Sequence, residues 1–169
     1  MATNEDFERV IGHISILFGS WDFFVAMTIA SLVADGAEVR NLDDETLSRK
    51  LRYLNELDPE EVVNRRLLQR IRSHLPGAFE ISRQRTNFLR DMWAFRPEKI
   101  SRGFIERIAM EVELRHDGDR LGFQTQDYSL EQLRELAGKI RQQHDLFLGF
   151  VSELQGGLQS ALRSRRAVV

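Results

Sequence analysis

Apolar residues near the N-terminus recur every three or four positions from Phe7 to Leu32, a spacing that predicts one long helix ending at Asp35-Gly36. Further apolar residues, among them Ile16 and Phe23, fall outside that stripe. One domain of this length buries one side of such a helix, so we expect a second subunit to cover the other.

The same period predicts three more helices before residue 97. A second helix of about a dozen residues follows position 44. Asp58-Pro59-Glu60-Glu61 combines an N-cap residue, a proline at the first helical position and early acids, which predicts the start of a third helix. Pro76-Gly77 is expected to break that helix. A fourth helix then runs from about Ala78 to Trp93.

After Pro97 the period changes to two. Alternating apolar and polar residues on both sides of Asp117-Gly118 predict a β-hairpin over about 104–127. Ser129 and Gln132 then form a capping box for a final helix, which we expect to fray at Gly156-Gly157 and leave a loose basic tail at about 159–169.

The final helix carries a heptad pattern. Its apolar seam consists of Leu133, Ala137, Ile140, His144, Phe147, Val151, Leu154 and Leu158. We favour packing of this seam against the first helix over a coiled coil between subunits. The predicted fold is therefore all-α: one domain over 1–169, an up-and-down bundle of about five helices with one hairpin insert.

Composition removes several classes of function. The 169 residues include no cysteine, so thiolate catalysis, disulfides and cysteine zinc sites are excluded. The four histidines lack ligand-like spacing, and we expect neither a metal nor a cofactor. No basic, signal-like segment opens the chain, and Asp22 interrupts the most apolar stretch, so we expect a cytoplasmic protein without a membrane span.

Charge is unevenly distributed along the chain. The net charge is −2, yet the segment from Arg65 to Arg102 holds ten lysines and arginines against three acids, Glu80, Asp91 and Glu98. A basic segment of this kind indicates either a polyanionic partner or an arginine face balanced by acids elsewhere in the fold.

The centre of this basic segment is Glu80–Phe95, where arginines alternate with large apolar residues. A face of this composition is partly buried, and arginine is seldom buried without a carboxylate or phosphate partner. The candidate phosphate-binding residues are Arg83, Arg85, Thr86, Arg90 and Arg96.

The order of elements resembles the HEPN group of small helical proteins, in the bacterial type whose fourth helix ends in Arg-Asn, three residues, His, Gly, any residue, Trp. With Trp93 as the anchor, Arg85 falls on the arginine, Thr86 on the following polar residue and Arg90 on the histidine. Trp21-Asp22 resembles the apolar-acid pair of that family's first helix. The resemblance covers roughly residues 5–155.

The resemblance implies a homodimer and metal-independent RNA cleavage. A 2′-hydroxyl attacking a phosphate needs a base near neutral pH, for which histidine is suited. Arg90 stays protonated and cannot be that base, whereas Arg85 can still bind phosphate bidentately. We therefore expect no catalytic residue, and a degenerate dimer that binds RNA or another phosphate-rich ligand.

Two alternatives remain open at this point. The first is a protein-interaction scaffold whose arginines pair with Asp and Glu of the same assembly. The second is a ribonuclease with a substitute base, for which His74 is the candidate. For Asp22 we expect a buried hydrogen-bonding role or a partnership with one of the arginines.

Overall fold

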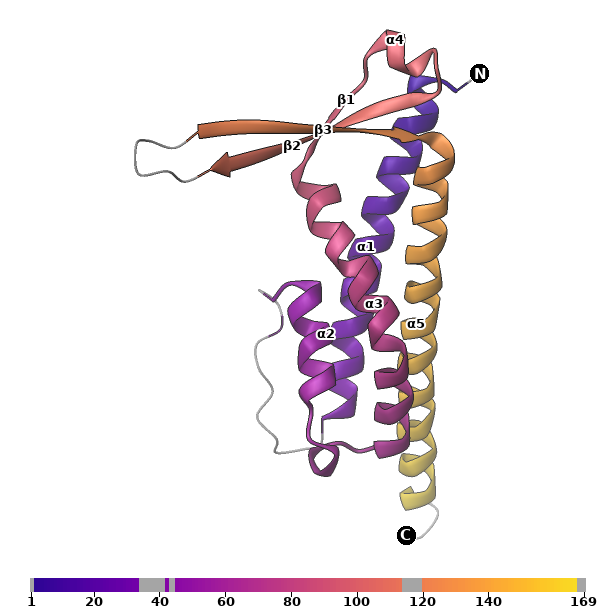
Figure 1. The fold of residues 1–169 in the computed structure, drawn as a ribbon. Coiled ribbons are helices and arrows are strands. Elements are labelled where there is room, and N and C mark those ends of the chain that lie inside the picture. The colour runs from indigo at the N-terminus through magenta and orange to yellow at the C-terminus, as the bar shows by residue number, and fades with distance from the viewer. Residues whose placement is uncertain (1, 34–41, 43–44, 114–119, 167–169) are drawn as a thin grey trace. The chain divides into compact units, whose positions relative to one another are not determined.

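The computed structural model describes residues 2–33, 42, 45–113 and 120–166 (Figure 1). The described chain is mostly helical and includes a small three-stranded antiparallel sheet, so the all-α prediction holds only in its coarser form. The elements in order are α1 (Asn4–Leu32), α2 (Leu47–Glu56), a 3-10 turn (Pro59–Glu61), α3 (Arg65–Arg90), β1 (Met92–Ala94), α4 (Pro97–Ile100), β2 (Phe104–Glu113), β3 (Arg120–Ser129) and α5 (Leu130–Arg166).

The chain divides into two compact units. The first, here called the sheet unit, consists of residues 1–17 and 84–139; the second, the helical unit, consists of residues 18–83 and 140–169. Three helices, α1, α3 and α5, run through both units. That the chain is one domain stays a prediction.

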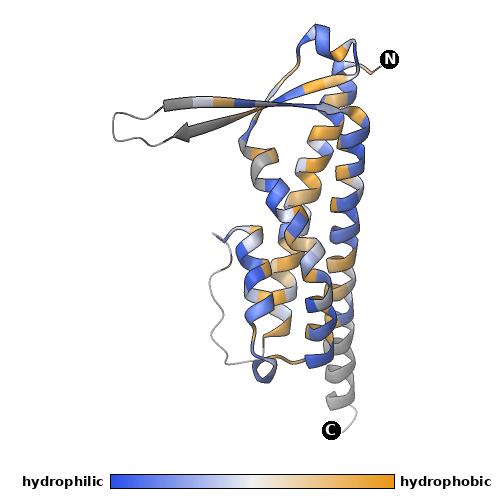
Figure 2. Ribbon diagram, viewed as in Figure 1, coloured by the Kyte–Doolittle hydropathy of each residue, from blue (hydrophilic) through white to orange (hydrophobic). Residues whose placement is uncertain are grey.

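In the helical unit, α1 supplies the centre of the core. Phe18, Trp21 and Ile29 are fully buried, and the Trp21 ring lies 6.4 Å from that of Phe147 on α5. Apolar residues recur along α1 among polar ones (Figure 2). By length and composition alone α1 is able to cross a membrane, a test that the core helix of a soluble protein also passes.

The heptad seam of α5 is buried within a single chain. Leu133, Ile140, Phe147 and Leu154 are each at most 5% exposed. In the helical unit the seam meets α1, because the His144 ring packs edge-on against Phe24 at 5.2 Å. The favoured prediction for this seam is therefore confirmed. The helix continues through Gly156 and Gly157 to Arg166, beyond the point where we expected it to fray.

The start of α3 differs from the prediction. The Asp58 carboxylate accepts a hydrogen bond from the Glu60 N–H at 2.8 Å, but it caps only the 3-10 turn. Val62 then forms a β-bridge with Val33, which holds the chain extended. The long helix begins at Arg65, with the Asn64 side chain accepting from the Leu67 N–H at 3.0 Å.

The expected break at Pro76-Gly77 is absent, because α3 is continuous from Arg65 to Arg90. An internal proline costs a helix about 3 kcal/mol. Leu75 and Ala78 on either side of it are buried, as are Ile71 and Ile81 one turn away. Each large apolar side chain contributes about 1.5–3 kcal/mol on burial, so packing outweighs the proline.

The predicted hairpin is present as β2 and β3, and a strand that we did not predict, β1, joins it. Met92 pairs opposite Ile108 and Ala94 opposite Glu106, giving the order β1-β2-β3. The fourth predicted helix therefore ends before Trp93. The capping box is confirmed: Ser129 N–H donates to Gln132 at 2.8 Å, and Gln132 N–H donates to Ser129 Oγ at 3.1 Å.

Candidate functional site

The predicted phosphate-binding residues do not form a set of free cations. Arg83 is exposed and Arg85 is half-buried on α3, while Arg96 lies at the N-terminus of α4. The side chains of Thr86 and Arg90 lie outside the described part of the structure. An arginine-lined cleft built from all five residues stays a prediction.

Arg96 faces an acid of its own chain. Its Nε lies 3.0 Å from Glu106 Oε2, an ion pair without hydrogen-bond alignment. Lys99 Nζ donates to Glu106 Oε1 at 2.8 Å and to Asp127 Oδ1 at 2.6 Å. These hydrogen bonds, first to Asp127 and then to Glu106, raise the pKa of Lys99. Glu106 is only 5% exposed, so its charge is compensated inside the sheet unit by two cations.

A second cluster fixes the junction between α3 and the sheet. Asp91 Oδ2 lies 3.1 Å from Arg107 Nε, again as an ion pair without hydrogen-bond alignment, and Arg107 donates to the Tyr128 hydroxyl at 3.2 Å. The Trp93 ring packs 4.9 Å from Phe88 and 5.5 Å from Tyr128, and its Nε1 donates to the Phe88 carbonyl at 3.2 Å. This cluster explains why the helix ends and β1 begins.

Next to this junction the sheet unit contains a small hollow of about 150 Å³. It is lined by Gln84, Phe88, Arg107, Tyr128, Gln132, Glu135, Leu136 and Lys139. Its two cations each have an acid: Arg107 has Asp91, and Lys139 lies 2.7 Å from Glu135. The hollow is thus close to neutral, and its size suits a small polar group better than a chain of phosphates.

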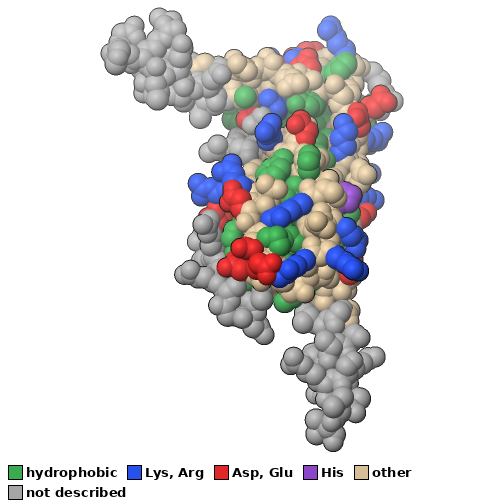
Figure 3. Space-filling view, turned by 60° about the horizontal axis from the view of Figure 1, so that its bottom comes forward, with side chains coloured by type: hydrophobic (Ala, Val, Ile, Leu, Met, Phe, Trp, Pro, Cys, Tyr) green, Lys and Arg blue, Asp and Glu red, His purple; other side chains and the backbone are tan. Residues whose placement is uncertain are grey.

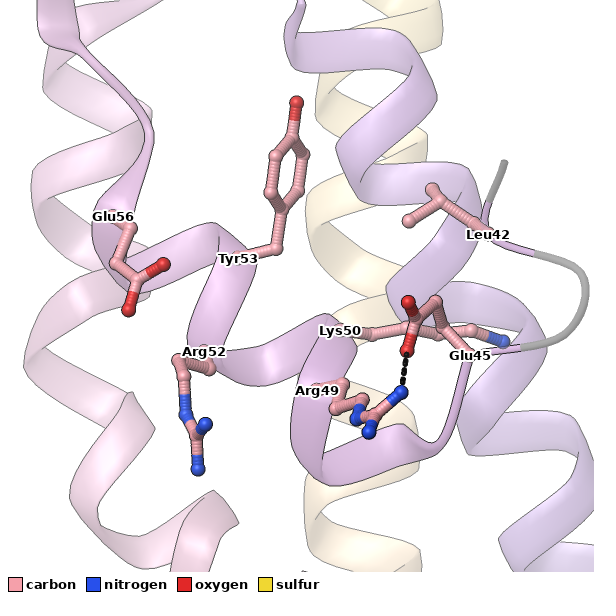
Figure 4. Close-up of a pocket in the computed structure, with 7 residues that line it drawn as sticks. All are labelled: Leu42, Glu45, Arg49, Lys50, Arg52, Tyr53 and Glu56. Carbon is pink, nitrogen blue, oxygen red and sulfur yellow. Dashed lines mark hydrogen bonds and ion pairs between the residues drawn. The ribbon is translucent and has the colours of Figure 1, made fainter. Parts of the chain in front are cut away.

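A hollow of about 380 Å³ in the helical unit lies along α2 (Figure 4). Glu45 and Arg49 form an ion pair across it at 3.2 Å, and Tyr53, Arg52 and Glu56 line the remainder. Charges of both signs line this hollow as well. No motif in the sequence predicts this hollow, because most of its residues belong to an ordinary charged face of an amphipathic helix.

Lys50, another residue of α2, was not singled out by sequence reasoning, and it forms an ion pair with Asp22. Its side chain is 7% exposed, and its Nζ lies 3.1 Å from Asp22 Oδ1. For Asp22 we expected either a buried hydrogen-bonding role or an arginine partner, and its cation is instead a lysine. An aspartate in an apolar helix signals a buried cation, but the spacing of α2 does not reveal which residue supplies it.

His74, the candidate substitute base, does not approach Arg85. Because α3 is continuous, the eleven residues between them correspond to roughly 16 Å of helical rise. His74 is exposed, and its ring lies 6.2 Å from that of Phe150. Over the described residues there is also no group of His, Asp and Glu able to hold a metal ion.

The basic segment is extensively paired beyond these clusters. Arg65 pairs with Glu60, Arg70 lies 2.9 Å from Glu153, and Arg72 donates to the Leu57 carbonyl. On the face drawn in Figure 3, Lys and Arg side chains are interspersed with Asp and Glu and do not form a continuous basic surface.

Comparison with known proteins gives no relative: no family model, no curated protein and no solved structure matches the chain. The resemblance to the HEPN group therefore rests on the order of elements and on the motif around Arg85 and Trp93, and it stays a prediction.

Proposed function

We propose that this protein is a non-catalytic interaction scaffold, in which the arginines of the basic segment organise the fold instead of binding RNA. The observation that carries the proposal is the pairing of Arg96 and Lys99 with the buried Glu106. Arg107, just beyond the segment, pairs in the same way with Asp91 inside it. A phosphate would have to compete with these carboxylates, and drawing the cations away would leave the buried Glu106 without a compensating charge, which is destabilising.

Exposed apolar side chains also favour a protein partner. In the sheet unit Met92 is 62% exposed, Phe123 is 59% exposed and Leu89 is 47% exposed; in the helical unit Phe23 is 59% exposed. Single exposed apolar residues are ordinary. Several large ones in a chain whose charges are mutually compensated favour a protein surface as the partner.

The second candidate function is the binding of RNA or another phosphate-rich ligand by a degenerate HEPN-like dimer. It is favoured by Arg83, which is exposed and contacts no acid among the described residues. The same holds for Arg66 and Arg102, so three cations of the segment remain accessible to a polyanion. They are distributed along the chain from residue 66 to 102, and we therefore place this candidate second.

The test is a titration of a labelled structured RNA with the purified protein, followed by fluorescence anisotropy over a salt series. The scaffold proposal expects only weak binding that disappears by about 150 mM salt, as for non-specific contacts. The Arg83→Ala/Arg85→Ala variant is then expected to behave like the parent. Binding tighter than about 1 μM at that salt, lost in the variant, would overturn the scaffold in favour of the phosphate-binding candidate.

A further inference from the structure

The outer edge of the sheet is formed by β3, a strand of ten residues. β3 pairs along its whole length with β2, and β1 lies on the far side of β2. No other strand in the described part of the chain pairs with β3. Alternate residues of an antiparallel edge strand point their N–H and C=O groups away from the sheet, so β3 presents a row of backbone groups for another strand.

Beyond β1 the sheet is only a two-stranded ribbon. β1 reaches no further along β2 than Ile108, so Ala109–Glu113 and Arg120–Gln124 pair only with each other. Along β3, Gly122–Asp127 are all exposed, although successive side chains of a strand point to opposite faces. A ribbon of only two strands is marginally stable in water, so an additional strand would stabilise the ribbon of β2 and β3.

The edge lacks the features that usually prevent strand addition. Exposed edges are commonly guarded by lysine, by proline or by other charges. Residues 121–126, Leu-Gly-Phe-Gln-Thr-Gln, contain none of these. Asp127 ends the uncharged run, and its carboxylate is already bound to Lys99.

Charge and symmetry narrow the choice of partner. Residues 104–129 contain six acids and three arginines, a net charge of −3 without His116, which disfavours a nucleic acid. The residues that would meet at the edge, 121–126, are themselves uncharged, so the edge is compatible with a second copy of the chain. Antiparallel pairing of two identical strands is closed by a two-fold axis, and the run at 121–126 brings no like charges together at the centre.

We propose that two copies of this protein pair through their β3 strands, antiparallel and edge to edge, to form a continuous six-stranded sheet. This pairing rests on the proposed scaffold function, and it makes a second copy of the chain one partner of the scaffold. The two-fold axis passes midway between the two copies of one residue, so a single position between 121 and 126 lies directly opposite its own copy. Its neighbours along the strand are separated from their copies by several ångströms more.

The absence of cysteine makes a direct test possible. Single cysteines are placed at each position from 121 to 126, and the proteins are exposed to mild oxidation. We expect one position to give most of the covalent dimer, because only there do the two Cβ atoms come within disulfide range. Gln142→Cys, at an exposed site on α5, is the matched control and is expected to stay monomeric.

Mass in solution provides the second readout. Light scattering is expected to give twice the chain mass of 19.7 kDa for the parent and one chain mass for Thr125→Lys, since an edge lysine blocks strand addition. Gln142→Lys is expected to remain dimeric. A monomeric parent, or a cysteine scan without a preferred position, would overturn the pairing, and circular dichroism verifies that each variant is folded.

The RNA titration tests the scaffold function, and the cysteine scan and mass measurement test the β3 pairing, so the failure of one proposal can be told from the failure of the other. A chain that ignores RNA but is monomeric keeps the scaffold function and loses only the β3 pairing. A chain that binds RNA tightly through Arg83 and Arg85 loses the scaffold function, whatever its mass.

Discussion

Lys99 is the residue whose protonation the structure controls most directly. Its ammonium group bridges Glu106 and Asp127, and the hydrogen bonds to them raise its pKa above the ordinary value of 10.5. The folded state therefore holds this proton more tightly than the unfolded chain does. The resulting stabilisation is complete below pH 10.5 and is lost as the pH rises through the higher pKa of the folded state.

We expect the free energy of unfolding of the parent to fall as the pH rises above 10.5, and part of that fall to be missing in Lys99→Met. Urea titrations at fixed pH values measure the difference. Arg102→Met, which removes an exposed cation outside this bridge, should keep the slope of the parent. If Lys99→Met and the parent lost stability in parallel, the bridge would contribute nothing to folding.

Pro76 is an exposed proline inside α3, flanked by buried residues. We expect Pro76→Ala to stabilise the protein by about 1–3 kcal/mol, because it restores the missing N–H and removes the clash of the ring with the preceding turn. The gain is reduced by the greater freedom of the unfolded chain. The measurement is the midpoint of urea unfolding.

Gly77→Ala is the matched control for this substitution. A Cβ at Gly77 would meet only Gln143 Nε2, at 3.8 Å, so we expect a smaller gain of up to about 1 kcal/mol. A loss of stability in Pro76→Ala would mean that the proline sets a bend on which the packing of α3 depends.

Patterns within one element were sufficient to predict α1, α2, the hairpin and the capped α5, because their periods and caps are local. The errors lie where a distant partner decides. The bridge of Val62 with Val33 delays α3, buried neighbours carry the helix past Pro76, and pairing with β2 turns Met92–Ala94 into a strand. Val33 and β2 lie outside the elements that they change, and the burial of the residues on either side of Pro76 is decided by tertiary packing.

The candidate site shows the same limit. Sequence reasoning identified the basic segment and offered two outcomes, a polyanion or internal acids. The acids that hold Arg96 and Arg107 are Glu106 and Asp91. Pairing Arg96 with Glu106 needs the β1–β2 register, which the sequence did not predict because β1 was read as helix.

On the scale of the whole molecule, continuity of the helices matters more than the boundary between the units. α1, α3 and α5 each contribute to the sheet unit and to the helical unit. Because each of these three helices has turns in both units, unfolding one unit shortens the helices of the other. Because helix formation is cooperative, the two units should lose their structure together.

The two tryptophans make this testable, because Trp93 lies in the sheet unit and Trp21 in the helical unit. Trp21→Phe keeps only the fluorescence of Trp93 in the sheet unit. Trp93→Phe keeps only the fluorescence of Trp21 in the helical unit. In each variant we expect the fluorescence midpoint in urea to coincide with the midpoint of helix loss by circular dichroism, as in a two-state transition. The comparison is internal to each variant, so the stability lost by removing an indole does not affect it. Midpoints that separate would instead identify two domains that fold independently.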